Sequence, residues 1–560
     1  MQISLIALNA RYTHSCAALF YVRRELEKNL PEAAVLLQQF TINDPYYEIL
    51  LKITAAKPEA LFFSVYIWSA AVIRRLIADL KRVMPAVPIV LGGPEAENLP
   101  AGLIKTGCSL ISGQVEGLDP SFYRDLKGRS LQPLYKAAPG APFAMPYRPR
   151  DFEEGLKNRH IYYESSRGCP FSCTYCLSSL DRRVVARDLE EVRQELAEIL
   201  KQKPGIIRFV DRTFNAPPKR ALALWQDLAA AGGETTFHFE IAPDLFDEEM
   251  LLFLEQLQSG KFQFEIGLQS TNPVTLAAIN RTMDLEKVRT NIHRLAAADN
   301  IHLHLDLILG LPFETPETFR HSFNEAFFLR PHYLQMGLLK VLPGTPMSRK
   351  ASEFNLISST EPPYALLASG WMNHAELSHL FWFGECVEAF YNNRFFRSLW
   401  PYVSKVEPEP FTFFERLLQL CQAQGFFELS KTQELLSRML LLMAQDREDG
   451  KLITELLRYD WLRCGHRFLP GHLSSAPMNE ARDLVWHELP ESLPPWFSLR
   501  TRSEFFKRTI FYRFSGALLR EVGLAATEES AVVCFLPRQT KGVLRHQQTV
   551  VLQPGDPEQG

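Results

Sequence analysis

Three cysteines lie within eight residues of one another in the stretch RGCPFSCTYC, and their spacing indicates metal chemistry. Cys169, Cys173 and Cys176 follow a CxxxCxxC pattern. The chain has only nine cysteines among its 560 residues, which is too few for a disulfide framework. Three thiolates on one short loop are ligands for a metal ion or for an iron–sulfur cluster. This loop is therefore the first candidate for a functional site.

The chemistry of three cysteines differs from that of four. A structural zinc ion takes four protein ligands, and the next cysteine in the chain is Cys386, so a zinc site would need His160 to complete a Cys3His set. A four-iron cluster held by three thiolates instead leaves one iron open, which can bind a second molecule and pass it an electron. The spacing favours the cluster, with zinc and unreactive thiols as the alternatives.

A regular alternation of strands and helices surrounds the cysteine loop over residues 159–350. The apolar runs predict strands at 161–166, 206–210, 235–241, 262–268, 302–309 and 333–341. Helical periodicity falls between them, at 189–201, 219–231, 248–258, 285–298 and 316–329. Six consecutive units predict a partial (β/α)6 barrel with catalysis at the carboxyl ends of its strands, and the cysteine loop follows the first strand.

A second α/β alternation occupies residues 1–130. It predicts strands at 3–9, 35–40, 60–66, 89–93 and 109–113, with helices at 17–28, 44–56, 70–83 and 98–106. This pattern is typical of a doubly wound, flavodoxin-like domain, which binds ligands at the carboxyl ends of its strands. No GxGxxG follows the first strand, so a dinucleotide is not expected. Residues 131–158 contain five prolines and are predicted to be a linker.

The alternation stops after the barrel, and residues 360–552 are predicted to form a helical and mixed C-terminal domain. Between Phe381 and Tyr402, nine of 22 residues are aromatic. Such a stretch at helical spacing is more often core than binding site, although it could also cap the barrel. Residues 500–552 hold nine Lys and Arg against four Asp and Glu.

Composition excludes several classes of protein. The net charge is −3, so no overall basic field indicates nucleic-acid binding. The longest nearly apolar run, residues 60–73, is shorter than the roughly 18 residues of a membrane span. The N-terminal MQISLIALNAR has no basic segment before its apolar stretch. These features predict a cytoplasmic protein without a membrane span.

The cysteine motif after the first strand of a six-unit barrel resembles the radical S-adenosylmethionine (SAM) superfamily. That resemblance implies a 4Fe-4S cluster on Cys169, Cys173 and Cys176, with SAM chelated to the open iron and cleaved to a 5′-deoxyadenosyl radical. It further implies SAM contacts at the aromatic position before the third cysteine and in the strand-end motifs FVDRTFN, FEIGLQS and LILGLPFET, while LPGTP resembles the ending of the sixth strand. The implied SAM-binding residues are Tyr175, Asp211, Glu265, Gln269, Gly310 and Glu314. For Asp211 and Glu265 the alternative is a buried carboxylate paired with a barrel arginine.

The N-terminal domain resembles the cobalamin-binding domain of one branch of that superfamily. The resemblance lies in the loops after its strands and implies cobalamin contacts from Asn9, Tyr12, Ser64, Tyr66, Trp68, Gly92, Gly93 and Glu116. SGQVEG at 112–117 matches the domain's Gly-Glu-Gly-Glu turn only at Gly113 and Glu116. The DxHxxG motif that supplies a cobalt ligand is absent, because Tyr12 and Ala17 flank His14 where Asp and Gly would stand. The alternatives are that this domain binds a nucleotide or that it binds no ligand.

The combined resemblance implies a cobalamin-dependent radical SAM enzyme that acts on a small molecule. It would transfer a methyl group to carbon or phosphorus or carry out an oxidative cyclisation, with electrons from a donor such as flavodoxin or ferredoxin. One alternative is an RNA methylthiotransferase, which would need an N-terminal cysteine cluster that Cys16 and Cys108 cannot supply. Another is a non-catalytic sensor of cobalamin or of an iron–sulfur cluster.

Overall fold

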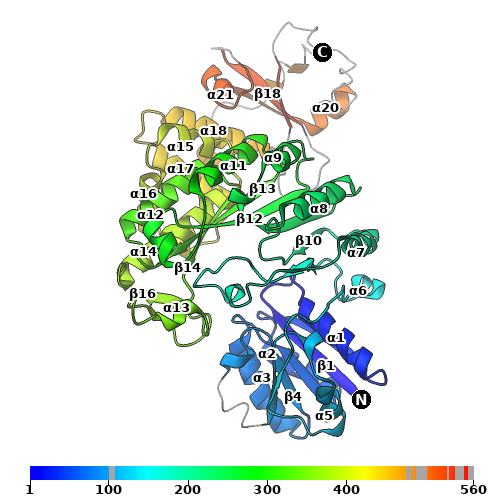
Figure 1. Cartoon of the computed structure of the whole chain (residues 1–560). Helices are drawn as coiled ribbons and strands as arrows, with labels where there is room; N and C mark the ends of the chain where they lie inside the picture. The colour runs from blue at the N-terminus through cyan, green and yellow to red at the C-terminus, as the bar shows by residue number, and fades with distance from the viewer. Residues whose placement is uncertain are drawn as a thin grey trace.

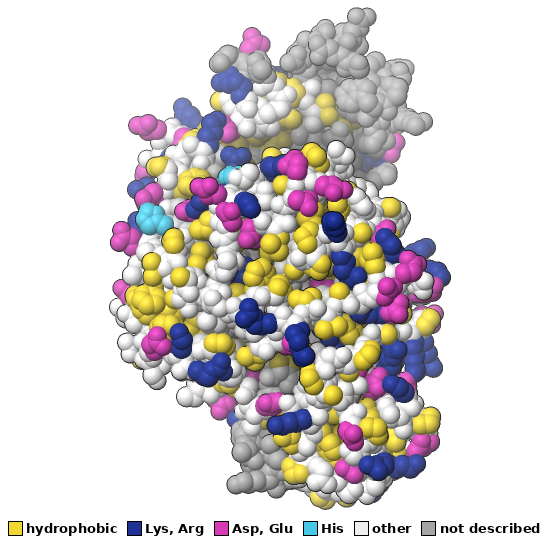
Figure 2. All heavy atoms as spheres, viewed as in Figure 1, with side chains coloured by type: hydrophobic (Ala, Val, Ile, Leu, Met, Phe, Trp, Pro, Cys, Tyr) yellow, Lys and Arg dark blue, Asp and Glu magenta, His cyan; other side chains and the backbone are white. Residues whose placement is uncertain are grey.

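The structure is a computed structural model that describes residues 1–99, 107–474, 481–482, 485–486, 501–525, 529–536 and 548–552. Figure 1 shows an N-terminal α/β domain at the bottom, a second α/β unit in the middle, helices packed beside it, and a small sheet at the top. Acidic and basic side chains are interspersed over the face seen in Figure 2, without a continuous basic surface there. Among the described helices, none combines the length and apolar character needed to cross a membrane.

The N-terminal sheet is parallel and confirms the predicted doubly wound fold. Its strands are β1 (Gln2–Asn9), β2 (Ala34–Thr41), β3 (Ala60–Ser64), β4 (Ile89–Gly92), β5 (Cys108–Ser112) and β6 (Leu134–Lys136), in the order β2-β1-β3-β4-β5-β6. The helices are α1 (Ala17–Asn29), α2 (Tyr46–Ala55), α3 (Ala70–Val83) and α5 (Pro120–Gly128). The helix predicted over 98–106 lies almost wholly outside the described residues.

Strand β6 lies inside the segment predicted as a linker. Tyr135, which is 8% exposed, packs edge-on against Phe122 of α5 at 4.9 Å between ring centroids. That burial fixes three residues against β5 although the surrounding segment is rich in proline. A short helix, α6 (Pro149–Glu153), follows, and its Asp151 forms a buried ion pair with Arg23 of α1 at 2.6 Å. The segment is therefore packed onto the N-terminal domain.

The middle unit is the open six-stranded parallel barrel that the sequence predicts. Its strands are β7 (Ile161–Tyr163), β10 (Ile206–Phe209), β11 (Thr236–Ile241), β12 (Phe262–Gln269), β13 (His302–Leu309) and β14 (Tyr333–Leu338), in the order β14-β13-β12-β11-β10-β7. The helices are α7 (Leu189–Lys201), α8 (Pro218–Ala230), α9 (Glu248–Glu255), α10 (Pro273–Ala278), α11 (Leu285–Ala298) and α12 (Pro316–Phe328). Buried and part-exposed residues alternate along β12 and β13, so one face of each strand packs on helices and the other faces the lumen.

The C-terminal region packs against the β14 edge of the barrel. A small hairpin, β15 (Ile357–Ser358) and β16 (Leu366–Ala368), leads into α14 (His374–Val387), a π-helical turn η5 (Glu388–Asn392), α15 (Leu399–Val406), α16 (Pro410–Ala423), α17 (Gln433–Ala444) and α18 (Gly450–Arg463). Most aromatic residues of 381–402 are buried in a core shared with the barrel, which confirms the core interpretation. Helix α20 (Arg502–Arg508), α21 (Gly516–Glu521) and the antiparallel strands β17 (Ile510–Phe514), β18 (Ala531–Leu536) and β19 (Gln548–Leu552) complete the described chain.

Candidate functional site

The three clustered cysteines lie on the loop between the two-residue strand β8 (Ser166–Arg167) and the 3-10 turn η3 (Leu177–Leu180), at the carboxyl end of β7. All three are free thiols. The amide of Thr174 donates to the carbonyl of Ile279 at 2.9 Å, and the amide of Met347 donates to the carbonyl of Thr174 at 2.9 Å. Neighbouring barrel units therefore hold the middle of the loop in place.

The entry to this loop requires glycine. Gly168 has φ +93°, and a Cβ on it would fall 1.9 Å from the carbonyl oxygen of Arg183. A side chain at this position would therefore push apart the two strands of chain that bracket the loop.

The geometry does not support the Cys3His zinc alternative. His160 lies at the opposite end of β7, where its amide donates to Thr13 at 2.7 Å and its ring is 5.2 Å from that of His14. In the part of the chain that the structure describes, no three Cys, His, Asp or Glu side chains are grouped so as to hold a single metal ion. Three thiols without a fourth ligand remain, which fits a cluster with one open iron.

Arg281 joins the cysteine loop to the end of β12. Its Nη1 donates to the sulfur of Cys173 at 3.6 Å, and its Nη2 donates to the carbonyl of Gly267. Burial lowers the pKa of Arg281, but the nearby Tyr175 and Cys173 outweigh that effect, so its pKa is raised and it stays charged. Arg281 therefore places a buried positive charge beside Cys173. No spacing pattern in the sequence marks Arg281.

Two predicted SAM residues lie beside this group. Burial raises the pKa of Tyr175, whose ring packs next to Cys173 and Cys176. Gln269 ends β12 with φ +69°, and its buried Oε1 has no hydrogen-bond partner among the described residues. A buried carbonyl oxygen without a donor is costly, so it suits a ligand that brings an N–H or O–H group.

Glu265 faces the barrel lumen and is paired there. Its Oε2 lies 3.3 Å from Nη2 of Arg208 and 3.0 Å from Nε2 of His238. Burial raises the pKa of Glu265, but the hydrogen bond from His238 and the charge of Arg208 lower it to about 2 overall. Pairing with a barrel arginine is the alternative to a SAM contact that the sequence analysis gave for Glu265. The carboxylate is 31% exposed, so it stays accessible to a ligand.

Asp211 lies beneath the strand ends. It is 1% exposed and accepts hydrogen bonds from the Ser165 amide at 3.0 Å and from the hydroxyls of Ser165 and Ser166 at 2.6 Å each. No arginine pairs with it directly. In this position Asp211 shapes the turn that leads to the cysteines, and a contact with SAM would require this network to open.

The other two predicted SAM residues are packed in the interior. A Cβ on Gly310, at φ +85°, would lie 2.4 Å from a methyl group of Leu366, so this glycine serves contact with the C-terminal region. Glu314 is 0% exposed, and its Oε1 accepts from the hydroxyl of Ser270 at 2.6 Å. Burial raises the pKa of Glu314 to about 8. Contact between Glu314 and SAM would likewise require rearrangement.

The N-terminal domain contains a cavity of about 210 Å³ at the carboxyl ends of β3, β4 and β5. It contains four predicted cobalamin residues, namely Ser64, Gly92, Gly93 and Glu116. A Cβ on Gly92 would meet nothing within 4 Å, so this glycine leaves open space, whereas a Cβ on Gly93 would lie 2.6 Å from the carbonyl oxygen of Val65. Side chains of α1, including Leu19 and Val22, form an apolar wall.

The other predicted cobalamin residues lie outside that cavity. Asn9 is buried and donates to Gln39 at 3.2 Å, while Tyr12 is 60% exposed and lies 4.4 Å from the guanidinium of Arg159. Tyr66 and Trp68 stack at 4.5 Å, and Trp68 is 44% exposed, so this pair offers a flat surface near the strand ends. Nδ1 of His14 is hydrogen-bonded to the hydroxyl of Tyr162 at 2.5 Å, so this ring points at the barrel.

Arg167 connects the cavity of the N-terminal domain to the cysteine loop. Its guanidinium donates to Glu116 at 2.8 Å, to Gln114 at 2.8 Å and to Glu164 at 2.9 Å, and its side chain is only 12% exposed. Glu116 is therefore occupied by an ion pair between the two domains. Arg167 lines both the N-terminal cavity and a neighbouring one of about 340 Å³, which also contacts Gly168 and Leu177 at the cysteine loop.

Comparison with known families divides the chain as the structure does. The B12 binding domain family matches residues 3–118, and the radical SAM superfamily matches residues 163–326. A family described as a protein of unknown function (DUF4080) matches residues 352–530. The three matches follow one another along the chain and do not overlap.

Individual relatives agree with the family matches. A 2-(S-pantetheinyl)-carbapenam-3-carboxylate methyltransferase of Streptantibioticus cattleyicolor is 23% identical over 65% of this chain and 61% of its own length. The cobalamin-dependent radical SAM methyltransferase TokK of Streptomyces tokunonensis is 25% identical over 52% and 48%. The chain therefore spans roughly half to three fifths of these curated relatives. The cobalamin-dependent SAM radical enzyme OxsB shares the fold, with a TM-score of 0.58, 13% identity, and 82% of this chain and 78% of that chain covered.

We predict that Arg167→Gln destabilises the protein, because it leaves Glu116 and Glu164 buried without their cation. Loss of one partner of a buried pair costs about 3–5 kcal/mol. Arg183→Gln is the matched control, since its ion pair with Asp181 is 66% and 57% exposed and is expected to contribute under about 1 kcal/mol. Thermal unfolding followed by circular dichroism measures both. Equal melting temperatures for the two variants would show that the ion pairs of Arg167 with Glu116 and Glu164 do not stabilise the protein.

We predict that Glu314→Gln stabilises the protein at pH 8 but not at pH 5. Folding raises the pKa of the Glu314 carboxyl group to about 8, so this group stays protonated in the native state below that pH. In the unfolded chain it ionises at its ordinary, lower pKa. The free energy of unfolding therefore falls as the pH rises from that ordinary pKa toward 8. The amide removes this dependence, and the gain at pH 8 should be on the order of 1–3 kcal/mol. Denaturant unfolding at both pH values measures it, with Glu317→Gln on the exposed face of α12 as control. A pH-independent difference would show that Glu314 is ionised in the native state.

Proposed function

We propose that this chain, a radical SAM protein with an N-terminal B12-binding domain and an additional C-terminal domain, is a cobalamin-dependent methyltransferase acting on a small molecule. The observation that carries the proposal is the position of Arg167. This residue lines the cavity of the B12-binding domain and lies two positions before Cys169, so both cofactor sites open toward the same space.

The residues divide into three groups by the cofactor they would hold. Cys169, Cys173 and Cys176 would bind a 4Fe-4S cluster, and the guanidinium of Arg281 would lie beside it at Cys173. Glu265, Gln269 and Tyr175 would contact SAM, because they combine an accessible carboxylate, a buried carbonyl oxygen without a donor, and an aromatic ring. The cavity lined by Ser64, Gly92 and Gly93, with the stacked Tyr66 and Trp68 nearby, would hold cobalamin. When bound, these cofactors supply the electron that cleaves SAM and the carrier for the methyl group.

The lumen provides a proton-holding group close to this space. Glu240 on β11 lies 3.9 Å from Arg212, which lines the space beside the cysteine loop. Burial raises the pKa of Glu240 to about 7, despite the opposing charge of Arg212. A carboxylate with a pKa near neutrality can take up or release a proton at its Oε atoms. Glu240 would therefore accept the proton that a trigonal carbon loses when it gains a methyl group.

Methyl transfer is preferred to the alternatives for two reasons. The similar curated proteins named above are methyltransferases, and the two matches cover 65% and 52% of this chain. An RNA methylthiotransferase would need a second cysteine cluster, whereas Cys16 and Cys108 are buried on separate elements of the N-terminal domain. An electron donor such as flavodoxin or ferredoxin would serve the cluster.

We predict that the triple variant Cys169→Ala, Cys173→Ala, Cys176→Ala forms no 5′-deoxyadenosine. The wild-type protein, reconstituted anaerobically and reduced, should cleave SAM, because only it can hold the cluster. Liquid chromatography with mass spectrometry measures the nucleoside, and Cys464→Ala serves as control, since that thiol lies outside the loop. Formation of 5′-deoxyadenosine by the triple variant at the wild-type rate would overturn the cluster assignment. Absence of the nucleoside from the wild-type protein would favour a sensor.

We predict that cob(II)alamin bound to this protein shows no nitrogen superhyperfine splitting in its EPR spectrum. Nδ1 of His14 is already hydrogen-bonded to the hydroxyl of Tyr162. Residue 12 is a tyrosine and not a carboxylate, so it does not orient the histidine as a metal ligand. Burial and the charges of Arg208 and Arg11 lower the pKa of His14, so its ring is neutral. The spectrum should be the same in His14→Ala. A nitrogen triplet that disappears in His14→Ala would show that this histidine turns to the cobalt.

A further inference from the structure

A third cavity, rich in arginine, lies where the C-terminal region meets the barrel. It has a volume of about 220 Å³ and is lined by Ala296, Asp299, Phe327, Arg330, Pro331, His332, Tyr391, Arg394, Arg397, Trp400, Pro401 and Ser404. His332 directly precedes β14, so the cavity lies at the amino end of that strand. The cysteine loop lies at the carboxyl ends of the barrel strands, and a six-residue strand is roughly 17 Å long. The cavity is therefore separate from the site described above.

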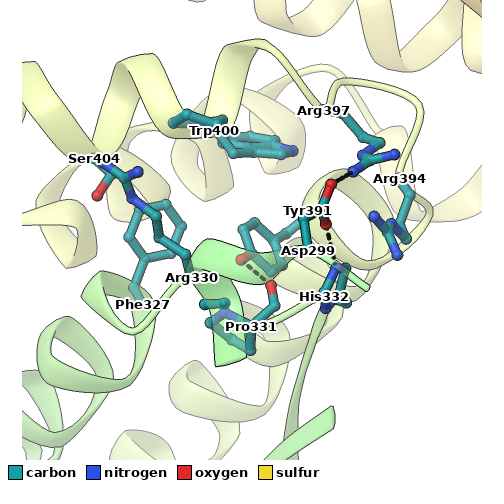
Figure 3. Close-up of a pocket in the computed structure, with 12 residues that line it drawn as sticks. Asp299, Phe327, Arg330, Pro331, His332, Tyr391, Arg394, Arg397, Trp400 and Ser404 are labelled. Carbon is teal, nitrogen blue, oxygen red and sulfur yellow. Dashed lines mark hydrogen bonds and ion pairs between the residues drawn. The ribbon is translucent and has the colours of Figure 1, made fainter. Parts of the chain in front are cut away.

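Both halves of the chain build this cavity (Figure 3). Asp299, Arg330 and His332 come from the barrel, while Tyr391, Arg394, Arg397 and Trp400 come from η5, the following loop and α15. In Figure 3, Arg394 and Arg397 lie on one side with Asp299 and His332, and Arg330 lies on the other side near Ser404. The cavity therefore exists only because the C-terminal region is packed on the barrel.

Positive charge exceeds negative charge in the lining. Asp299 is the one acidic residue there, and it is shared between Arg397 at 2.8 Å and His332 at 2.8 Å. Nδ1 of His332 accepts from the amide of Leu303 at 3.0 Å, so the ring is a neutral donor toward Asp299. Three guanidinium groups thus face one carboxylate.

Two buried donors in the lining have no partner. Nη1 of Arg394 and the indole Nε1 of Trp400 are both buried, and neither has a hydrogen-bond acceptor among the described residues. Trp400 is only 6% exposed. Burial and the neighbouring charge of Arg397 lower the pKa of Arg394 to about 10, a sign that its charge is poorly compensated. Buried donors and uncompensated positive charge are stabilised by an anion that accepts hydrogen bonds.

The remaining walls are aromatic and apolar. Tyr391 lies 5.3 Å from Phe327 and 5.8 Å from Trp400 between ring centroids, and Pro331 and Pro401 complete the walls. Arg330 and Arg394 adopt left-handed backbone conformations, with φ +53° and +61°. Such conformations cost energy in residues other than glycine and occur often where ligands are clamped.

We propose that this cavity binds a phosphate monoester, with the phosphate held by Arg394, Arg397 and the Trp400 indole and the organic part against the aromatic walls. Three arginines against one aspartate leave a charge of +2, which matches a phosphate dianion better than a carboxylate. Guanidinium groups present paired N–H donors that suit phosphate oxygens. Because both halves of the chain contribute, the bound ester would hold the C-terminal region on the barrel.

Phenyl phosphate is the probe for this site, and isothermal titration calorimetry on the full chain is the measurement. We expect saturable binding at constant ionic strength and weaker binding of benzoate. Arg394→Gln should weaken binding of phenyl phosphate at least about tenfold, since it removes a charged donor to the phosphate. Arg330→Gln, on the other side of the cavity, should weaken binding about threefold, since it removes one positive charge from the lining. Trp400→Phe, which keeps an aromatic ring but removes the N–H, should weaken it about threefold. Arg416→Gln, on an exposed position of α16, is the matched control and should bind as the wild type.

Three outcomes would overturn the proposal. Phenyl phosphate gives no saturable heat, or Arg330→Gln and Trp400→Phe bind it as tightly as the wild type, or benzoate binds as tightly as phenyl phosphate. Arg330 is exposed, so its variant should fold even if Arg394→Gln does not. The triple cysteine variant should bind phenyl phosphate unchanged, so this result stands or fails separately from the proposed enzymatic function.

Discussion

The ion-pair network of Arg167 is the interaction on which the arrangement of the two proposed cofactor sites depends. One buried guanidinium joins Glu116 and Gln114 of the N-terminal domain to Glu164 at the end of the first barrel strand. The burial that makes such a network expensive to break also fixes its geometry. Since Cys169 follows two residues later, the same network positions the cysteine loop against the cavity of the N-terminal domain. The contacts of the Arg167 side chain thus hold these two sites close together.

The open barrel supplies the rest of the site through the alternation of its strands. Phe264, Ile266 and Leu268 of β12 pack on helices, and the intervening Glu265 and Gln269 face the lumen. On β11, Glu240 lies level with Glu265. His238 of β11 and Arg208 of β10 lie two residues lower, level with Gln263. A parallel barrel that closed completely would bury such polar groups without partners. Here six strands leave an opening, and the C-terminal helices cover its β14 edge rather than its mouth.

The sequence predicts the fold well where periodicity is local. The bounds of α3, α7 and α11 agree with the helices predicted from spacing, and all six barrel strands lie where apolar runs predict them. The first strand is shorter than predicted, since residues 164–166 turn away to bond Asp211 and Arg167. Strand β6 could not be predicted from a segment with five prolines, because its partner β5 and the ring of Phe122 lie elsewhere in the chain.

The candidate site is only partly predictable for the same reason. The cysteines and Gly92 are marked by spacing and by strand ends, and the structure places them at the predicted loops. Arg281 and Arg208 are single arginines with no local pattern, and their importance lies in contacts with residues 57 to 108 positions away. Glu314 and Asp211 stand at motif positions, but burial decides their environment. Motifs locate the loops, and only packing shows which side chains face the ligand.

Spin coupling between the two cofactors tests the central claim most directly. Protein loaded with a reduced 4Fe-4S cluster and cob(II)alamin contains two unpaired spins. Their separation is limited because Arg167 lines the proposed cobalamin cavity and lies two residues from Cys169. Two residues of chain span at most about 7 Å. Continuous-wave and pulsed EPR should therefore show a dipolar interaction that broadens or splits both signals. A spectrum equal to the sum of the two separately loaded forms would contradict the account.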